Sequence, residues 1–95
     1  MLYLVRMDVT IPTELPQAET EAAKAQEKAL AQDLQRDGRW LHLWRVVGKY
    51  SNYSVFDVGS NDELHDILQG LPLYKFMQIQ VTPLAQHPSA IISAK

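Results

Sequence analysis

Residues 40–58, WLHLWRVVGKYSNYSVFDV, decide how the rest of the chain can fold. Two runs rich in β-branched and aromatic residues flank a short polar turn around residues 48–52, and this pattern is typical of an antiparallel hairpin. We therefore expect the neighbouring helices to cover this hairpin and to build any site against it. The hairpin carries most of the side chains that could take part in chemistry: Trp40, His42, Trp44, Arg45, Tyr50, Asn52, Tyr53 and Asp57.

The segments on either side of the hairpin give a β-α-β-β-α-β order. Residues 2–10 and 76–82 alternate between apolar and other side chains, which predicts two half-buried strands. Residues 16–37 are rich in good helix formers, and Gly38 then supplies a helix stop. Residues 60–63, Ser-Asn-Asp-Glu, form a capping box that opens a second helix. This order predicts an α+β, ferredoxin-like fold, with a four-stranded antiparallel sheet and two helices on one face.

Length and composition limit the possible functions. The chain has 95 residues, no cysteine and a formal net charge of −2. A chain this short forms one domain, residues 1–95, with a thin core, so association with further copies is a natural way to bury more surface. The weak negative charge argues against nucleic acid or a membrane surface as a partner, and no apolar run reaches the roughly 20 residues that span a bilayer.

The two ends of the chain carry expectations of their own. The N-terminus has the pattern of a strand rather than of an export signal, so we expect a cytoplasmic protein. The tail, residues 83–95, contains two prolines and an apolar pair, Ile91 and Ile92, without a clear period. We expect this tail to pack on a neighbouring subunit of a homo-oligomer.

One carboxylate of the first predicted helix stands where an apolar residue is expected. At about 100° per residue, Glu27 lies at the centre of the stripe that must face the sheet. The other members of this stripe are Ala23, Leu30, Ala31 and Leu34. Burial of an ionised carboxylate is costly and raises its pKa unless a cation pairs with it. Glu27 is therefore either a structural ion-pair partner of Lys24 or Arg45, or a general base with a pKa tuned toward neutrality.

The first strand of the hairpin offers a titratable group to the helix in either orientation. Strict alternation puts His42 and both tryptophans on one face and Arg45 on the other. Each candidate also has a structural interpretation. His42 could be a core or interface histidine, and Arg45 an interface ion-pair partner. Tyr50 and Asn52 could serve the turn or the packing.

Other chemistries find little support in the sequence. His42, His65 and His87 show no metal-ligand spacing, and without cysteine there is no disulfide or Cys-based metal site. The glycines form no phosphate-binding loop, and no serine stands in a nucleophile elbow. The chemistry that remains is a pocket without metal or cofactor, with a carboxylate, cationic groups and apolar walls. Such a pocket suits proton transfer on a small organic anion.

Specific strings of residues run through the chain from Met1 to about Ile91. They are AQEK at 25–28, LQR at 34–36, HLWR at 42–45, NYSVFDV at 52–58, LPL at 71–73 and HPS at 87–89, together with Trp40, Tyr50 and the pair Leu64 and His65. In these strings the chain closely resembles the muconolactone isomerase family of the β-ketoadipate pathway, which breaks down catechol. The resemblance implies isomerisation of muconolactone to 3-oxoadipate enol-lactone, without metal or coenzyme, by a homo-oligomer that is a decamer in the family.

The resemblance also implies a mechanism, in which a proton moves between the γ and α carbons of an unsaturated lactone through a dienolate. Glu27 is then the single general base, and Lys24 and Arg45 hold the substrate carboxylate or offset charge on the lactone oxygen. The remaining candidates are hydrogen-bonding groups for the dienolate, Tyr50, Asn52 and His42, and walls that exclude water, Trp40, Trp44 and Phe56.

Three other functions fit the same residues. A sister enzyme could act on a chlorinated lactone, where the same dienolate expels chloride. A cofactor-free oxygenase of the dimeric α/β-barrel type, or a small-ligand binding module, would use similar subunits and leave Glu27 as a structural ion-pair partner. The ultraviolet absorbance of muconolactone mixed with purified protein discriminates among these possibilities.

Overall fold

The structure is a computed structural model that describes residues 1–91, and its elements follow the predicted order. They are β1 (Leu2–Val9), α1 (Gln17–Arg36), β2 (Trp40–Arg45), β3 (Ser51–Asp57), α2 (Asn61–Gln69), a short 3-10 helix η1 (Tyr74–Phe76) and β4 (Met77–Leu84). One half of the predicted capping box is present at the start of α2, where the Ser60 side chain accepts a hydrogen bond from the backbone N–H of Glu63 at 3.0 Å. The Glu63 carboxylate accepts from the N–H of Gly59 at 2.7 Å, one residue before the expected donor. Gly38, at a φ of 88°, lets the chain turn sharply after α1.

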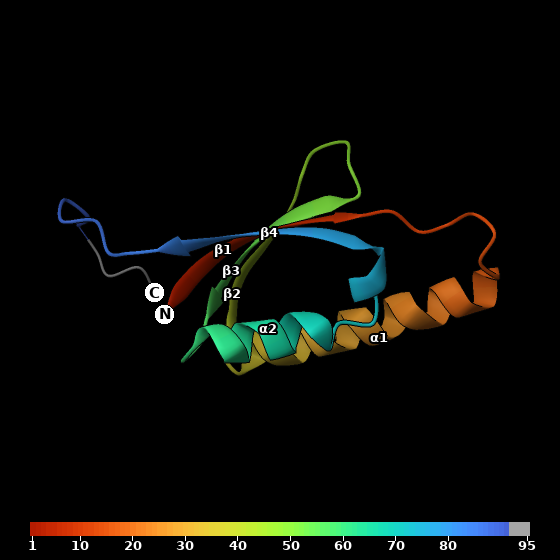
Figure 1. Ribbon diagram of the computed structural model, residues 1–95, viewed down its shortest axis with the longest axis horizontal. Helices are drawn as coiled ribbons and strands as arrows, with labels where there is room; N and C mark the ends of the chain where they lie inside the picture. The colour runs from red at the N-terminus through yellow and green to blue at the C-terminus, as the bar shows by residue number, and fades with distance from the viewer. Residues whose placement is uncertain (92–95) are drawn as a thin grey trace.

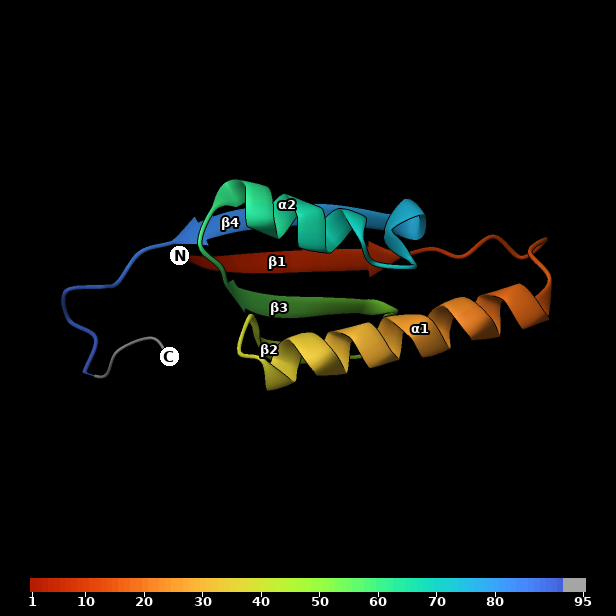
Figure 2. The ribbon, with the colours of Figure 1, turned by 90° about the horizontal axis from the view of Figure 1, so that it is seen from below.

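The strands form one four-stranded antiparallel sheet in the order β2-β3-β1-β4. Both helices lie on the same face of this sheet, α1 beside β2 and α2 toward β1 and β4 (Figures 1 and 2). The predicted ferredoxin-like arrangement is therefore confirmed for the single chain. β4 continues to Leu84, two residues beyond the predicted end at Thr82. It includes Pro83 because β4 is an edge strand, where a missing N–H donor is tolerated.

The core lies between the helices and the covered face of the sheet. Alternation along β1 sends Tyr3, Val5 and Met7 to this face, where all three are buried. They pack in one cluster with buried residues of α1, β2, β3 and α2 and of the segments that follow β3 and α2. These residues are Ala31, Leu34, Trp40, Phe56, Val58, Leu64, Leu68 and Leu71. The core thus joins both helices to the sheet and fixes the position of α1 over β2.

A β-bulge in β2 breaks the strict alternation that the sequence predicts. Trp40 pairs with Phe56, but the next pair is His42 with Val55, so Leu41 is an extra residue in the strand. The extra residue reverses the alternation after Trp40. Trp40 and Arg45 consequently share the helix-covered side, whereas His42 lies on the opposite side. Neither of the two predicted faces of this strand is therefore found intact.

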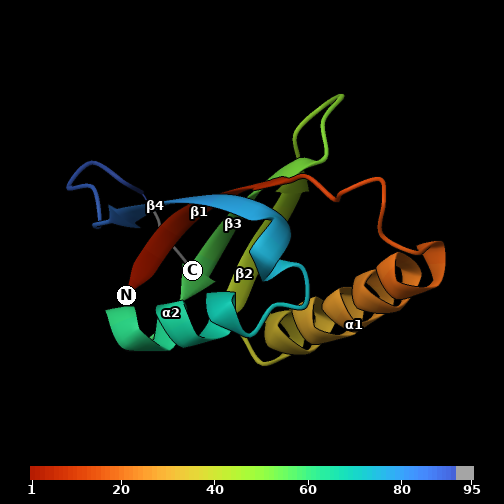
Figure 3. The same cartoon turned by 45° about the vertical axis from the view of Figure 1, so that its right-hand side comes forward.

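The turn of the hairpin begins earlier than predicted. β2 ends at Arg45 and β3 starts at Ser51, so the turn spans residues 46–50 and projects from the sheet (Figure 3). It is closed by the N–H of Val46, which donates to the carbonyl of Ser51 at 2.9 Å. Gly48, at a φ of 79°, adopts the left-handed conformation that such a tight turn needs. Asn52, predicted as a turn residue, consequently lies in β3 and pairs with Arg45.

The described part of the tail, residues 85–91, leads away from the sheet (Figure 1). Ile91 is fully exposed in the single chain, and residues 92–95 of the predicted tail lie outside the described residues. The helices within residues 1–91 include none that is long and apolar enough to cross a membrane.

Candidate active site

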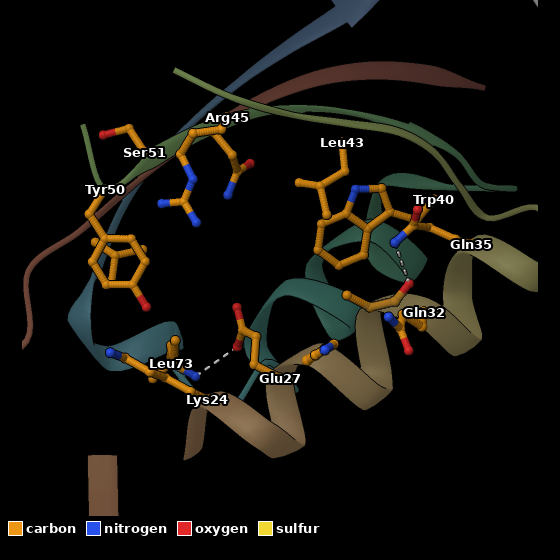
Figure 4. A pocket seen from close by; sticks show the side chains of 14 residues that line it. Lys24, Glu27, Gln32, Gln35, Trp40, Leu43, Arg45, Tyr50, Ser51 and Leu73 are labelled. Carbon is orange, nitrogen blue, oxygen red and sulfur yellow. Dashed lines mark hydrogen bonds between the residues drawn. The ribbon is translucent and has the colours of Figure 1, made fainter. Parts of the chain in front are cut away.

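A cavity of about 460 Å³ lies between α1 and the β2–β3 hairpin (Figure 4). This volume is within the range of small-molecule sites. α1 lines the cavity with Lys24, Glu27, Lys28, Ala31, Gln32 and Gln35, the hairpin with Trp40, Leu43, Arg45, Tyr50, Ser51 and Asn52, and two other segments with Val9 and Leu73.

Glu27 lies on the sheet-facing side of α1, as its place in the apolar stripe predicts. It is half-buried, and the backbone N–H of Leu73 donates to its Oε1 at 2.9 Å. Burial raises the pKa of the Glu27 carboxyl above its ordinary value, and the hydrogen bond from Leu73 offsets part of that rise. Within residues 1–91 no ion pair joins Glu27 to Lys24 or Arg45. The structure therefore favours a tuned carboxylate over a structural ion pair.

Two cations meet at one end of the cavity, around the ring of Tyr50. The Lys24 Nζ lies 5.6 Å from the centroid of this ring, and the Arg45 Cζ lies 5.1 Å from it. Contacts of this kind hold a cation over an aromatic face without neutralising its charge. Figure 4 shows Arg45 extending from the sheet into the cavity, opposite Glu27 on the helix. This end of the cavity is suited to an anionic group.

Trp40 and Leu43 lie at the other end of the cavity, beside Gln32 and Gln35 of α1 (Figure 4). Trp40 is almost completely buried, and its ring lies beside Leu43 above the helix (Figure 4). Asn52 also lines the cavity, and its Oδ1 accepts a hydrogen bond from the hydroxyl of Ser54 at 2.8 Å. The cavity therefore has two cations around Tyr50 at one end and the ring of Trp40 at the other.

Three of the predicted site residues, His42, Trp44 and Phe56, lie outside the cavity of their own chain. His42 is exposed on the uncovered face of the sheet and stacks on Trp44, with ring centroids 4.8 Å apart. The bulge at Leu41 explains this position, because it turns His42 away from α1. Phe56 is completely buried in the core and packs against Trp40 at 4.7 Å, so it supports that wall from behind.

The cavity also contains residues that the sequence did not single out. Gln35 lies about 80° from Glu27 around α1, so helical spacing could have found it. Gln32 lies about 140° away, and its place at the cavity depends on how α1 sits against β2. Strict alternation predicts that Leu43 shares a face with Arg45 and that Trp40 lies on the opposite face. Because of the bulge, all three side chains line the cavity. No sequence signal indicates that the backbone of Leu73, far along the chain, meets Glu27.

The described residues show what chemistry the cavity can support. Among residues 1–91, no group of three or more His, Cys, Asp or Glu side chains could hold a metal ion. Glu27 is the one carboxylate that lines the cavity, and its raised pKa makes it a better proton acceptor than an exposed glutamate. The fold and cavity define a class of protein: a small ferredoxin-like α+β protein whose cavity combines one carboxylate of raised pKa with cationic side chains.

Comparison with known proteins makes the assignment more specific. The family model described as muconolactone delta-isomerase matches residues 1–90, so the chain belongs to this family of isomerases. The muconolactone delta-isomerase of Cupriavidus pinatubonensis is 63% identical over 91 residues, which cover 96% of this chain and 99% of the relative. That of Acinetobacter baylyi is 55% identical over 91 residues, covering 96% and 95%. A crystal structure of muconolactone isomerase matches with a TM-score of 0.93 and 53% identity, covering 98% of this chain and 97% of the other.

Proposed function

We propose that this protein isomerises muconolactone to 3-oxoadipate enol-lactone in the breakdown of catechol, with Glu27 as a single general base. The main support for the proposal is the half-buried carboxylate, with a raised pKa, in a cavity that Lys24, Lys28 and Arg45 also line. Membership of the muconolactone delta-isomerase family supplies the substrate. The proposal needs no metal or coenzyme, because the reaction changes only the position of a proton and a double bond.

The proposed reaction moves one proton across the lactone ring. The ionised carboxylate of Glu27 takes the proton from the γ carbon, and the C–H electron pair spreads through the ring to the carbonyl oxygen as a dienolate. The protonated Glu27 then returns the proton to the α carbon, and the double bond ends between the β and γ carbons. Because both carbons can present the same face of the ring, one carboxylate can reach both.

We assign the rest of the cavity by charge. Arg45 and Lys24 bind the carboxylate of the substrate or offset the negative charge of the dienolate. Tyr50 and Asn52 offer hydrogen bonds to the reacting oxygens. Trp40 excludes water, which keeps these electrostatic interactions strong. His42, Trp44 and Phe56 are left out of this set, because all three lie outside the cavity.

We also propose that the protein works in the cytoplasm as a homo-oligomer, with ten subunits as the family resemblance implies. The sheet face opposite the helices supports this proposal, since it carries Trp44 and Tyr53 with 56% and 38% of their surfaces exposed. Exposed apolar patches of this kind are typical of protein interfaces. The part of the predicted tail that follows β4, from residue 85 on, then packs on a neighbouring subunit. Size-exclusion chromatography with light scattering tests the assembly, and a stable monomer at micromolar concentration would contradict it.

The activity is tested with purified protein and muconolactone. We expect the ultraviolet absorbance to change as the double bond moves, and product analysis to give the enol-lactone. In D₂O a single-base shuttle should return part of the original hydrogen to the α carbon, because the proton stays on Glu27. An unchanged lactone would refute the proposed isomerase. Release of chloride from a chlorinated lactone, together with an unchanged muconolactone, would indicate the dehalogenase instead.

A further inference from the structure

We propose that the backbone amide of Leu73 positions the base: it holds one oxygen of the Glu27 carboxylate and leaves the other to face the substrate. The inference rests on the proposed function, in which Glu27 carries the proton. It adds a second segment of the chain, the connection between α2 and β4, to a site otherwise built by α1 and the hairpin.

The amide of Leu73 can donate to Glu27 because the hydrogen bonds that close the turns of this connection come from other backbone amides. The N–H of Leu71 donates to the carbonyl of Leu68 at 3.2 Å, and the N–H of Tyr74 donates to the carbonyl of Leu71 at 2.9 Å. Pro72, between them, has no N–H to donate. The N–H of Leu73 points away from the turn and donates to Oε1 of Glu27 at 2.9 Å, although the two residues are 46 positions apart in the sequence.

The connection is a rigid support for such a bond. The side chains of Leu71 and Leu73 are buried, with 3% and 4% of their surfaces exposed, and Leu71 belongs to the core. Pro72 restricts the backbone between them. A backbone donor held in this way loses no side-chain entropy when it binds the carboxylate, unlike a lysine or arginine donor. Leu73 therefore holds Glu27 with a donor whose position is set by the packed backbone rather than by a flexible side chain.

The hydrogen bond distinguishes the two oxygens of the carboxylate. Oε1 accepts from Leu73, whereas Oε2 accepts no hydrogen bond from any residue in the range 1–91. Figure 4 shows this second oxygen pointing from the helix into the cavity, toward Arg45. A base that must take a proton from one carbon and return it to another benefits from such a fixed geometry, because small displacements of the reacting atoms are costly.

The test removes the N–H of Leu73 and leaves every side chain unchanged. In the full-length protein, Leu73 is exchanged for its α-hydroxy acid analogue by nonsense suppression, which turns the amide into an ester without a donor. The matched control is the same exchange at Tyr74, whose N–H bonds within the turn. We expect the exchange at Leu73 to lower kcat about tenfold, since bonds to charged groups are stronger than neutral ones. The acidic limb of the pH profile of kcat should move to higher pH, because the charged form of Glu27 loses a donor.

The outcomes separate this inference from the proposed function. If the ester at Leu73 has the same kcat and the same pH profile of kcat as the ester at Tyr74, the positioning role of Leu73 is refuted. If Glu27→Gln turns over normally, the base itself is misassigned. If Glu27→Gln is inactive but the ester at Leu73 has the kcat of its control, only the positioning role of Leu73 is overturned, and the role of Glu27 as the base stands.

A second measurement covers the case in which the ester protein does not fold. In wild-type protein labelled with ¹⁵N-leucine, the amide proton of Leu73 should titrate with the same midpoint as kcat. In Glu27→Gln, which can still accept the bond but cannot ionise, this titration should vanish. An amide proton that does not titrate in the wild-type protein would overturn the proposal.

Discussion

The two helices cover the same face of the sheet, yet they differ in what they do there. α2 has nine residues, a side-chain cap at Ser60 and two buried leucines, Leu64 and Leu68. α1 has 20 residues, no side-chain cap and also only two buried residues, Ala31 and Leu34. Its first turns extend past the end of the sheet (Figure 2). Per residue, α2 therefore contributes far more to the core than α1 does.

The difference shows how a cavity is made in a small protein. On its sheet-facing side, α1 carries Glu27 one turn before the buried Ala31. The sheet-facing side of α2 carries leucines instead. The space that a larger apolar side chain would close remains open above Glu27, and the cavity occupies it. α2 stabilises the fold, whereas α1 gives up part of its packing for chemistry. The predictions below test this division of roles, from the largest expected effect to the smallest.

Removing the charge of Glu27 should have the largest effect. Glu27→Gln keeps the size of the side chain and an acceptor for Leu73, but it cannot take a proton. We expect kcat to fall by about 10²- to 10⁴-fold, as is usual when a general base is lost, with little change in folding. Steady-state kinetics and circular dichroism measure both. Glu21→Gln, an exposed change on the same helix, is the control, and equal turnover in the two variants would contradict the assignment.

A cavity in α2 should affect stability rather than chemistry. Leu68→Ala removes a buried side chain from the core and should lower the free energy of unfolding by about 2–5 kcal/mol. The kcat of the folded fraction should stay within a few-fold of the wild-type value, since Leu68 does not line the cavity. Urea denaturation at fixed protein concentration, followed by kinetics, makes the measurement. A large loss of kcat in well-folded protein would show that α2 also serves the site.

Truncating Arg45 should weaken substrate binding. If Arg45 binds the substrate carboxylate, Arg45→Ala raises KM by about tenfold or more, with a smaller change in kcat. Arg36 offers a control, because its ion pair with Asp33 at 3.1 Å lies outside the cavity. Arg36→Ala should leave KM unchanged. An unchanged KM in both variants would assign Arg45 to assembly instead.

The smallest effect concerns the pH dependence of stability. Burial raises the pKa of Glu27 in the folded protein above its unfolded value, so the folded state binds the proton more tightly. This contribution to stability is complete below the unfolded pKa and is lost as the pH rises through the folded pKa. Glu27→Gln lacks it. The variant should therefore gain stability relative to the wild type as the pH rises from acid to neutral, by less than about 1 kcal/mol because the group is partly solvated. Urea midpoints across this range test the sign, and a constant difference would refute it.

Much of the candidate site follows from the sequence. The apolar stripe of α1 identified Glu27 and its orientation, because helical periodicity needs no knowledge of neighbouring elements. Arg45, Tyr50, Asn52 and Trp40 were also predicted, and the structure brings all four to the cavity with Glu27. His42, Trp44 and Phe56 were predicted to line the site, but the structure places the first two on the uncovered face and Phe56 in the core.

The sequence by itself determined the order of elements, the capping of α2 and the unusual place of Glu27, since each depends on residues within a few turns of one another. Only the tertiary structure decided which side of β2 faces α1. An extra residue in a strand can be recognised only by comparison with its partner strand. Here Trp40 pairs with Phe56 and His42 pairs with Val55, which leaves Leu41 without a counterpart. It also decided the contact between Leu73 and Glu27. That contact joins a backbone group to a side chain across the fold, and a backbone amide leaves no trace in the identity of its residue.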